Sequence, residues 1–313
     1  IIKYFKSDIS KFFIFPLLVV FSEFICANFI FGFPWFSFSL VNSNNLMGTS
    51  LIYYFGTYGL SFLTIVIFLF PGILLLKIRN KIGYILTMYM IIFIVIILLI
   101  LGRISTSSDS ELKSISGTIV QLNFPINQHL TEEQSQLKYN TIIDVIKNNL
   151  TDLIIFGEND YPYLMNNNDV HNLQNYLKSN QTLIIGAIRR DDTKYFNSFF
   201  LINKNKFKNF DKKFLVPFGE FIPIRSLFGF MEYIAGTVDF YRGNKKRILN
   251  LNKDFTIMPV ICYEIIYFWK LLKAENINSN LIVNLTNDSW FGKFSGPYQH
   301  LYFAKLRAAE FNK

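Results

Sequence analysis

A single thiol lies between an apolar run and a carboxylate in the stretch MPVICYEI, residues 258–265. It belongs to Cys262, and the chain has only one other cysteine, Cys26, inside an apolar run. Because helix-like residues follow Cys262 directly, its sulfur would lie at the positive N-terminal end of a helix, which favours the reactive thiolate. The sequence therefore predicts a nucleophile. The alternative is a buried structural cysteine, since free cysteine is among the most buried residue types.

Polar residues also follow two other strand-like runs. DLIIF leads to Glu158, and LIVNLT leads to the stretch NDSW, residues 287–290. Sheets of α/β proteins place their chemistry just beyond the carboxyl ends of the strands. We therefore expect Glu158, Cys262 and residues 287–290 to contribute to one site.

The segment 103–313 alternates strand-like runs with helix-like or loop-like stretches. The strand-like runs are TIVQLN (118–123), DLIIF (152–156), TLIIGA (182–187), SFFLI (198–202), TIMPVI (256–261) and LIVNLT (281–286), and the other stretches include 132–149 and 264–275. This alternation indicates an α/β fold. The segment is long enough to bury one full core, so we predict one domain there.

Residues 1–102 contain three long apolar runs, 12–30, 51–76 and 82–101. Each is long enough to cross a bilayer core, which needs about 20 helical residues. We predict a transmembrane helical region with three spans, with buried core helices as the alternative; three runs argue against a cleaved signal peptide. Glu23, a carboxylate within the first run, is a functional candidate, or pairs within the bundle, or lies near the membrane surface.

Lysine and arginine are unevenly distributed around these runs. They lie before the first run and between the second and third, whereas the loop of residues 31–50 has none; they are Lys3, Lys6, Lys11, Lys77, Arg79 and Lys81. Basic flanks face the cytoplasm, so residues 103–313 are predicted on the far side, which is the periplasm in a bacterium with two membranes. Cysteines normally pair in that oxidising compartment, but Cys26 lies within a span, so Cys262 is predicted to be unpaired.

The formal net charge of +9 does not indicate a nucleic-acid partner. Six of the 31 basic and two of the 22 acidic residues precede residue 103, which leaves 25 and 20 for the rest, an excess of +5. The basic run NKNKFKNFDKK, residues 203–213, has no pattern suited to a groove, and we interpret it as a solvated or lipid-headgroup-facing surface. His129, His171 and His300 show no ligand spacing, which predicts no metal site.

Four stretches carry a family resemblance: FGFPWF (31–36), KKFLVPFGEF (212–221), VICYEI (260–265) and NLTNDSWFGKFSGPYQHLYFAKLRAAE (284–310). In this order they resemble the signatures of bacterial apolipoprotein N-acyltransferases, the integral-membrane members of the nitrilase, or carbon-nitrogen hydrolase, superfamily. The resemblance implies a nitrilase-like α-β-β-α sandwich attached to a transmembrane helical bundle. It also implies transfer of an acyl chain from a phospholipid to the α-amine of the N-terminal diacylglyceryl-cysteine of an apolipoprotein. We expect no cofactor.

The same resemblance assigns site residues. It places the catalytic glutamate at Glu158, the lysine at Lys212, with Lys213 as the only competitor, and the nucleophile at Cys262. The usual motif around the glutamate is Trp-Pro-Glu, whereas this chain has Phe156-Gly157-Glu158. Supporting positions carry over as Asn197, Glu220, Tyr263 and Glu264, and Trp290 as a contact for the acyl chain or the lipoprotein.

These residue types suit acyl transfer. Glu158 would take the thiol proton, Cys262 would attack an ester carbonyl, and Lys212 would hold the tetrahedral oxyanion, which gives a thioester and ping-pong kinetics. Both substrates are lipids, so attachment to the membrane brings the site to them. The aromatic residues Phe31, Phe33, Trp35 and Phe36 suit that interface or form an ordinary aromatic belt.

Two other classes of function stay open: a membrane-anchored amidase of the nitrilase type, and a non-catalytic membrane scaffold that retains the fold. Family members continue beyond both ends of this chain, so we expect an incomplete bundle in residues 1–102 and a domain in 103–313 cropped at its C-terminal end. The expected location is the bacterial inner membrane, multi-pass, with the catalytic domain in the periplasm.

Overall fold

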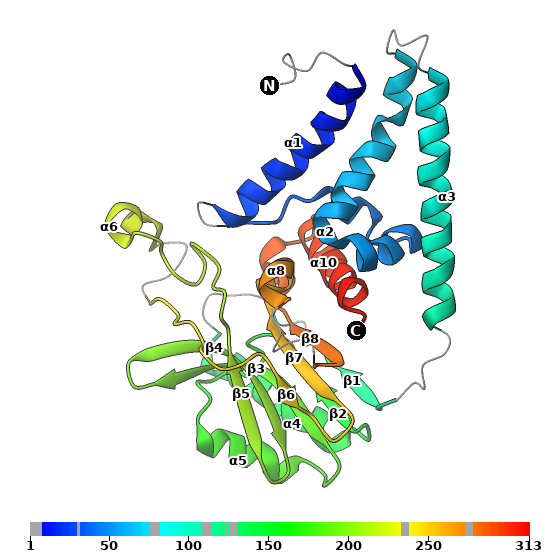
Figure 1. The fold of residues 1–313 in the computed structure, drawn as a ribbon. Coiled ribbons are helices and arrows are strands. Elements are labelled where there is room, and N and C mark those ends of the chain that lie inside the picture. Colours follow the sequence, from blue (N-terminus) through cyan, green and yellow to red (C-terminus); the bar gives the residue numbers. More distant parts are fainter. Residues whose placement is uncertain are drawn as a thin grey trace. The chain divides into compact units, whose positions relative to one another are not determined.

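The computed structural model describes residues 8–29, 32–75, 82–107, 114–122, 124, 130–232, 238–272 and 278–313. The chain forms two compact units, coloured along the sequence in Figure 1. The helical unit comprises Ile1–Leu112 and Leu301–Lys313, and the α/β unit comprises Lys113–His300. Residues 301–313 thus belong to the helical unit. The predicted division into a transmembrane region, 1–102, and a catalytic domain, 103–313, stays a prediction.

The helical unit contains α1, α2, α3 and most of α10. Their bounds are α1 Asp8–Asn28, α2 Leu46–Leu69, α3 Ile82–Ser107 and α10 Gly296–Phe311, with 3₁₀ turns η2 Phe38–Asn42 and η3 Phe70–Leu75. Among the described residues, two helices are long and apolar enough to cross a membrane, Leu46–Gly72 and Gly83–Ser105. The apolar part of α1, Phe12–Asn28, is shorter. Length and composition therefore support two of the three predicted spans, and the transmembrane bundle stays a proposal.

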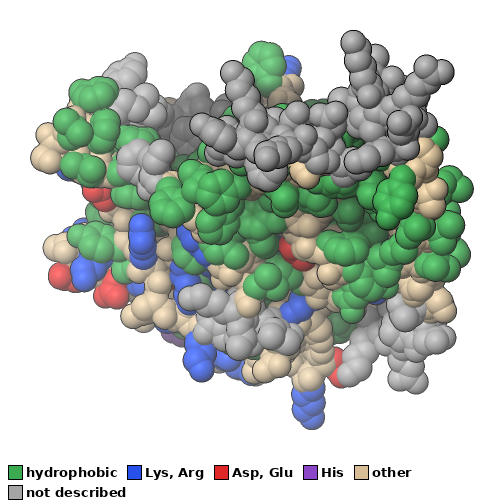
Figure 2. Space-filling view, turned by 45° about the horizontal axis from the view of Figure 1, so that its top comes forward, with side chains coloured by type: hydrophobic (Ala, Val, Ile, Leu, Met, Phe, Trp, Pro, Cys, Tyr) green, Lys and Arg blue, Asp and Glu red, His purple; other side chains and the backbone are tan. Residues whose placement is uncertain are grey.

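Helix α3 leaves most of its apolar side chains uncovered. Tyr84, Met90, Phe93 and Leu98 are each exposed by 60% or more. Figure 2 shows hydrophobic side chains gathered across one face of the molecule. Exposed apolar surface on this scale needs a covering partner or a lipid environment.

A break in α2 explains why the end of the chain joins the helical unit. Gly56 has left-handed backbone angles, φ 66° and ψ −177°, that interrupt the helix. The N–H of Thr57, freed by the break, donates to Glu310 at 3.0 Å, and the Thr57 hydroxyl accepts from Arg307 at 2.6 Å. Arg307 and Glu310 also form an ion pair at 3.1 Å. These buried contacts join α10 to the break.

Polar contacts also order the loop between α1 and α2. Glu23 is buried and accepts the backbone N–H of Phe38 at 2.8 Å and the Ser37 hydroxyl at 3.4 Å. Of its three predicted alternatives, pairing within the helical unit is observed, through the loop after α1, and a functional role and a place near the membrane surface stay predictions. Trp35 is buried against Phe303, with ring centroids 5.8 Å apart, whereas Phe36 is exposed.

The remaining residues expected at the membrane interface lie partly outside the described chain. The structure does not describe Phe31 or the basic residues Lys3, Lys6, Lys77, Arg79 and Lys81. It also does not describe the side chain of Lys11.

The α/β unit contains two sheets. The five-stranded sheet has the order β1-β2-β3-β4-β5, with strands β1 Gly117–Ile119, β2 Leu153–Ile155, β3 Thr182–Asp191, β4 Lys194–Asn203 and β5 Phe207–Asp211. The three-stranded sheet has the order β6-β7-β8, with strands β6 Leu249–Asn250, β7 Thr256–Ile261 and β8 Leu281–Leu285. Strands β1, β2 and β3 run parallel, as do β7 and β8, and the other pairs are antiparallel. The predicted α/β class is confirmed.

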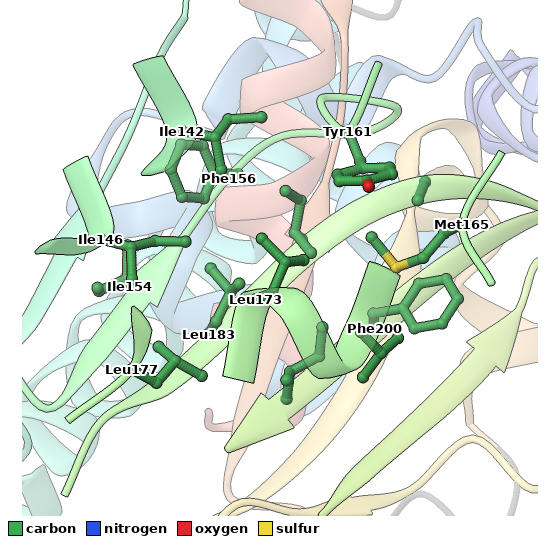
Figure 3. Close-up of a cluster of buried hydrophobic side chains, with 14 of the residues drawn as sticks. Ile142, Ile146, Ile154, Phe156, Tyr161, Met165, Leu173, Leu177, Leu183 and Phe200 are labelled. Carbon is green, nitrogen blue, oxygen red and sulfur yellow. The ribbon is translucent and has the colours of Figure 1, made fainter. Parts of the chain in front are cut away.

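Alternating side chains divide the unit into layers. On β2 and β3, Ile154 and Leu183 point to a core shared with α4 Glu132–Asn148 and α5 Asn167–Tyr176, and Figure 3 shows this cluster. Their neighbours Leu153 and Ile184 point the other way, into a second core shared with β6, β7 and β8. Because successive strand residues face opposite sides, helices, sheet and sheet form three consecutive layers. The second helical layer of the predicted sandwich stays a prediction.

Local capping signals position both covering helices. Thr131 and Gln134 exchange hydrogen bonds between side chain and backbone at the start of α4, and Asn166 and Asp169 do so at the start of α5. Such capping boxes satisfy N–H groups that a helix leaves free. Helix α5 and strands β5 and β6 were absent from the sequence expectations.

Strand β5 corrects the prediction of a solvated basic run at 203–213. Lys206 and Lys208 are exposed as expected, but Asp211 and Lys212 are buried. The reason is pairing across the fold: Phe210 packs into the core between the sheets, Asp211 accepts from Arg189 and Ser198, and Lys212 donates to Glu158 and Glu220.

Candidate active site

Cys262 occupies a strained turn at the end of β7. Strand β7 ends at Ile261, and Cys262 opens the 3₁₀ turn η5, Cys262–Ile266. Its φ of 50° lies in the left-handed region, which residues with a side chain rarely adopt. Such backbone outliers cluster at functional sites and persist only where surrounding contacts hold them. The turn also ends the strand, and Cys262 as a whole residue is half-buried.

The predicted helix effect on this thiol is wrong. Instead of one long helix over 264–275, a five-residue 3₁₀ turn is followed by the four-residue α8, Phe268–Leu271, and residues 273–277 lie outside the described chain. Burial and the negative Glu158 carboxylate raise the pKa of the Cys262 thiol well above its ordinary value, although Lys212 and a hydrogen bond with Thr286 oppose them. The resting side chain is therefore a thiol, and a base must remove its proton during attack.

Glu158 follows β2 on a tight turn. Phe156 is anchored in the core, and the N–H of Gly157 donates to Asp160 at 2.7 Å. A Cβ atom at Gly157 would lie 3.1 Å from the carbonyl oxygen of Thr286, which leaves little room for a larger residue. Gly186 of β3 packs against the same turn, where an added Cβ would lie 2.7 Å from Glu158 Cα. The departure from Trp-Pro-Glu thus suits the close packing around this turn.

Four groups surround the Glu158 carboxylate. Oε1 accepts from Asn197 at 2.7 Å and from Lys212 at 3.2 Å, and Oε2 accepts the backbone N–H of Asn287 at 3.2 Å. The Cys262 thiol is hydrogen-bonded to the same carboxylate. The three N–H donors thereby hold the buried Glu158 carboxylate in contact with the Cys262 thiol.

Lys212 is enclosed by two carboxylates. It directly follows β5, and its side chain is 1% exposed. Nζ donates to Glu220 at 2.9 Å as well as to Glu158 at 3.2 Å, and Asn197 donates to Glu220 at 2.9 Å. Burial alone would lower the pKa of Lys212, but the attraction of Glu158 and Glu220 raises it above its ordinary value. The site thus keeps a positive charge in a dry environment.

The competing Lys213 lies elsewhere. Its backbone N–H donates to Glu264 at 2.8 Å, and its ammonium lies 6.0 Å from the ring centroid of Phe210. The geometry therefore favours Lys212 for a role beside the thiol.

Glu264 and Tyr263 belong to the turn η5 and stabilise it through buried hydrogen bonds. Glu264 is fully buried and accepts two hydrogen bonds from Arg247, at 2.6 and 2.7 Å, and the N–H of Ile261 at 3.0 Å. The hydroxyl of Tyr267 donates to that of Tyr263 at 2.7 Å. Arg247 was not singled out in the sequence, where no local signal distinguishes it from other arginines.

His300 also reaches the nucleophile, although its sequence spacing suggested no site. Its ring nitrogens lie 2.6 Å from Asp288 Oδ1 and 3.1 Å from the carbonyl oxygen of Cys262. Cys262, Asp288 and His300 offer ligand atoms within 4.8 Å of one another, a set able to hold a metal ion, so the expectation of no metal stays a prediction. The shared motif of residues 284–310 could have pointed to this neighbourhood.

The other predicted positions lie away from this cluster or outside the description. His171 on α5 contacts Gln174 at 3.0 Å, and His129 lies outside the described residues. Trp290 belongs to the 3₁₀ turn η6, Asp288–Phe291, and its side chain lies outside the description as well.

The arrangement can support acyl transfer. A carboxylate touches both a thiol and an ammonium, so proton removal from sulfur and stabilisation of a developing oxyanion are available in one place. This is a cysteine-centred acyl-transfer geometry in an α/β unit.

Residues 108–313 match the family model of carbon-nitrogen hydrolases, and the chain belongs to that family. Residues 2–70 match the model of the apolipoprotein N-acyltransferase N-terminal domain. Together with the relatives below, these matches confirm the resemblance identified in the sequence motifs.

Curated relatives carry the name apolipoprotein N-acyltransferase. The protein of Rickettsia typhi is 32% identical over 320 residues, which cover 95% of this chain and 62% of that protein. The protein of Rhodopseudomonas palustris is 27% identical over 321 residues, which cover 92% and 58%. The chain thus spans about three fifths of the length of these relatives.

Solved structures of the superfamily show weaker likeness. A carbon-nitrogen hydrolase from Helicobacter pylori G27 has 13% identity and a TM-score of 0.40, covering 63% of this chain and 69% of that one. A CN-hydrolase superfamily protein from Xanthomonas campestris has 13% identity and a TM-score of 0.33, covering 49% and 58%.

Proposed function

We propose that the protein transfers an acyl chain from a phospholipid to the α-amine of the N-terminal diacylglyceryl-cysteine of apolipoproteins. The observation that carries this proposal is the fully buried Lys212 ammonium, 3.2 Å from a Glu158 carboxylate that is hydrogen-bonded to the Cys262 thiol. The match of residues 2–70 to the N-terminal domain of apolipoprotein N-acyltransferases supports the choice of lipid substrates.

The first half-reaction forms a thioester. As Cys262 Sγ attacks the ester carbonyl of the phospholipid, Glu158 takes the thiol proton, because the resting thiol holds it. Lys212 stabilises the negative oxygen of the tetrahedral intermediate. Collapse breaks the ester C–O bond, and the protonated Glu158 returns its proton to the departing lysophospholipid. The acyl group remains on the sulfur.

The second half-reaction transfers the acyl group to an amine. The α-amine of the diacylglyceryl-cysteine attacks the thioester carbonyl, and Lys212 again stabilises the oxyanion. Glu158 accepts a proton from the attacking amine, and the proton is returned to sulfur as the C–S bond breaks. These steps need neither a cofactor nor a nucleic acid.

The remaining predicted residues act as supports. Glu220 and Asn197 hold Lys212 and Glu158 in register through the hydrogen bonds described above. Glu264 and Tyr263 brace the backbone next to Cys262, and Trp290 contacts the acyl chain or the lipoprotein.

We propose a multi-pass protein of the bacterial inner membrane with its catalytic part on the periplasmic side. Two apolar helices of sufficient length and the uneven distribution of lysine and arginine support this placement. A membrane location also brings both lipid substrates to the site.

The decisive experiment supplies phospholipid with a labelled acyl chain and no acceptor. We expect a hydroxylamine-sensitive label on Cys262, because the first half-reaction needs no amine. The Cys262→Ala variant should carry no label, whereas Cys26→Ala should be labelled as the unmodified chain is. Addition of a diacylglyceryl-cysteine peptide should discharge the label into an amide.

Two alternatives give different outcomes. An amidase of the nitrilase type on a membrane anchor would use the same three residues but would pass an acyl group from a small amide to water. A non-catalytic scaffold would form no acyl-enzyme. A label that remains in Cys262→Ala would exclude Cys262 as the nucleophile.

A further inference from the structure

A hollow of about 650 Å³ lies against strands β3, β4 and β5. Ligand pockets of proteins span about 300–1,000 Å³, so this volume suits a small molecule. Its other walls come from residues 165–167, at the start of α5, and from residues 241–245. All of these residues belong to the α/β unit. The hollow is therefore a feature of that unit alone.

The hollow faces the helical layer and not the candidate active site. Phe200 on β4 lines it and belongs to the core shared with α4 and α5, whereas its neighbour Phe199 belongs to the core between the sheets. On β5, Asp211 lines the hollow, whereas the next residue, Lys212, donates to Glu158. Because neighbouring residues of a strand face opposite sides, the sheet separates the hollow from the candidate active site.

Basic side chains outnumber acidic ones around the hollow, five to two. The acidic ones are Asp191 and Asp211, and both pair with Arg189, at 3.5 and 2.7 Å. In the part of the chain that the structure describes, the other four basic side chains form no ion pair; they are Arg190, Lys194, Arg242 and Lys245. Their positive charges repel one another, and an anion among them would offset this repulsion.

Two of these four cations are held by neighbours that also line the hollow. Lys194 lies 5.4 Å from the ring centroid of Tyr241, and Lys245 donates to the Asn209 side chain at 2.6 Å. An ammonium has three N–H donors, so these contacts leave donors for a ligand. The two lysines approach from different walls, one after β3 and the other from residues 241–245.

We propose that this hollow binds a phosphate-bearing ligand with at least two negative charges, such as a phosphate monoester or a diphosphate. Arginine binds phosphate oxygens through two parallel N–H donors, and lysine binds them as a point charge. A single carboxylate would neutralise one of the four cations, whereas a phosphate group of higher charge offers oxygens to several of them. A soluble metabolite and a lipid phosphate share this chemistry. The site is independent of the proposed acyl transfer.

The test is isothermal titration calorimetry of the full chain in a non-ionic detergent, with inorganic pyrophosphate as the probe. At about 0.15 M salt we expect one saturable site with a dissociation constant of about 1 mM or lower, because several charge-assisted hydrogen bonds are available. Affinity should fall as sodium chloride is raised, since salt screens exposed charges. Acetate, with one negative charge, should not displace the pyrophosphate. Absence of saturable binding overturns the proposal.

Substitutions on two walls of the hollow locate the site. Lys194→Gln and Lys245→Gln should each weaken binding about tenfold, the effect of losing one charge-assisted hydrogen bond. Lys208→Gln is the matched control, because Lys208 is exposed on β5 and does not line the hollow. All three lysines are exposed, so the variants should melt as the parent chain does. An equal loss of affinity in Lys208→Gln would indicate attraction by net charge alone and would contradict the proposal.

Competition distinguishes the two sources of phosphate. Glycerol 3-phosphate and dioctanoyl phosphatidic acid carry the same phosphate monoester, and only the second carries acyl chains. If the ligand is a lipid, the phosphatidic acid should displace pyrophosphate at the lower concentration. If it is a soluble metabolite, glycerol 3-phosphate should do so at an equal or lower concentration. Either order supports the phosphate site, and displacement by neither compound contradicts it.

Discussion

Arg247 and Glu264 form a fully buried ion pair with two hydrogen bonds, Nη2 to Oε1 at 2.6 Å and Nη1 to Oε2 at 2.7 Å. The same carboxylate accepts the backbone N–H groups of Lys213, Phe214 and Ile261. One side chain thus ties the segment after Lys212 to the turn that begins at Cys262, although these segments are about 50 residues apart in sequence.

This pair predicts acid sensitivity. Burial would raise the pKa of Glu264, but Arg247 and the N–H donors hold it below its ordinary value. A lowered folded-state pKa adds stability that is present above pH 4.5 and is lost as the pH falls through the folded value. Glu264→Gln should cost about 3–5 kcal/mol at pH 7, because Arg247 is left buried and unpaired. In thermal melts between pH 7 and 3, its difference from the parent should narrow with falling pH.

The control for this prediction is Glu232→Gln, which removes an exposed partner of Arg225. It should change stability by about 1 kcal/mol or less, as surface pairs do. A constant difference between Glu264→Gln and the parent at every pH would show that Glu264 is not the group responsible.

The two adjacent lysines should differ sharply. Lys212→Ala should slow formation of the acyl-enzyme by about 10²-fold or more, as loss of an oxyanion donor commonly does. Lys213→Ala should be near neutral, because its ammonium lies over Phe210 and alanine keeps the backbone N–H that donates to Glu264. Single-turnover acylation with labelled phospholipid measures both. The reverse order would mean that the oxyanion partner has been assigned one residue too early.

Glu158→Gln should move two rates in opposite directions. Loss of the general base should slow acylation by phospholipid by about 10²–10⁴-fold. Alkylation of Cys262 should become faster at a given pH, because the Glu158 carboxylate is one of the causes that raise the pKa of the thiol.

Glu220→Gln is the matched comparison, since Glu220 contacts Lys212 as Glu158 does, whereas the thiol is hydrogen-bonded to Glu158. Glu220→Gln should change the alkylation rate of Cys262 less than Glu158→Gln does. Normal acylation by Glu158→Gln would place the base elsewhere.

Gly186→Ala tests the packing behind Glu158. Its Cβ would lie 2.6 Å from the carbonyl oxygen of Gly157 and 2.7 Å from Glu158 Cα, and both are backbone atoms that cannot move aside as a flexible side chain can. We expect acylation to fall about 10²-fold, the scale at which small misplacements of reacting groups cost rate. Gly229→Ala has open space around its Cβ and should be neutral. Equal activity of the two variants would show that the Glu158 turn tolerates displacement.

The lysine and arginine distribution predicts the side of the membrane. A reporter that is active only in the periplasm, fused after residue 313, should be active, and a reporter active only in the cytoplasm should be silent. The opposite pattern would reverse the orientation. Moving basic residues from 77–81 into the loop of residues 31–50 provides a control, since it should weaken the preference.

Local chemistry in the sequence was sufficient for the α/β class, and the motifs nominated the residues of the candidate site. Strand β7 and the start of β3 follow from apolar runs whose pattern is set by near neighbours, and the motifs around Lys212 and Cys262 are contiguous in the chain. The tertiary structure brings these residues together with Glu158 in the arrangement that the motifs implied.

Tertiary structure alone decided the electrostatic state of the site. The sequence suggested a thiolate at a helix start, but the thiol is held protonated by burial and by Glu158, which is 104 residues away along the chain. Lys212 looked like part of a solvated basic run, yet it is enclosed by Glu158, 54 residues distant, and Glu220. His300 reached the nucleophile across 38 residues. Desolvation and charge pairing depend on distances in space, which residue order does not contain.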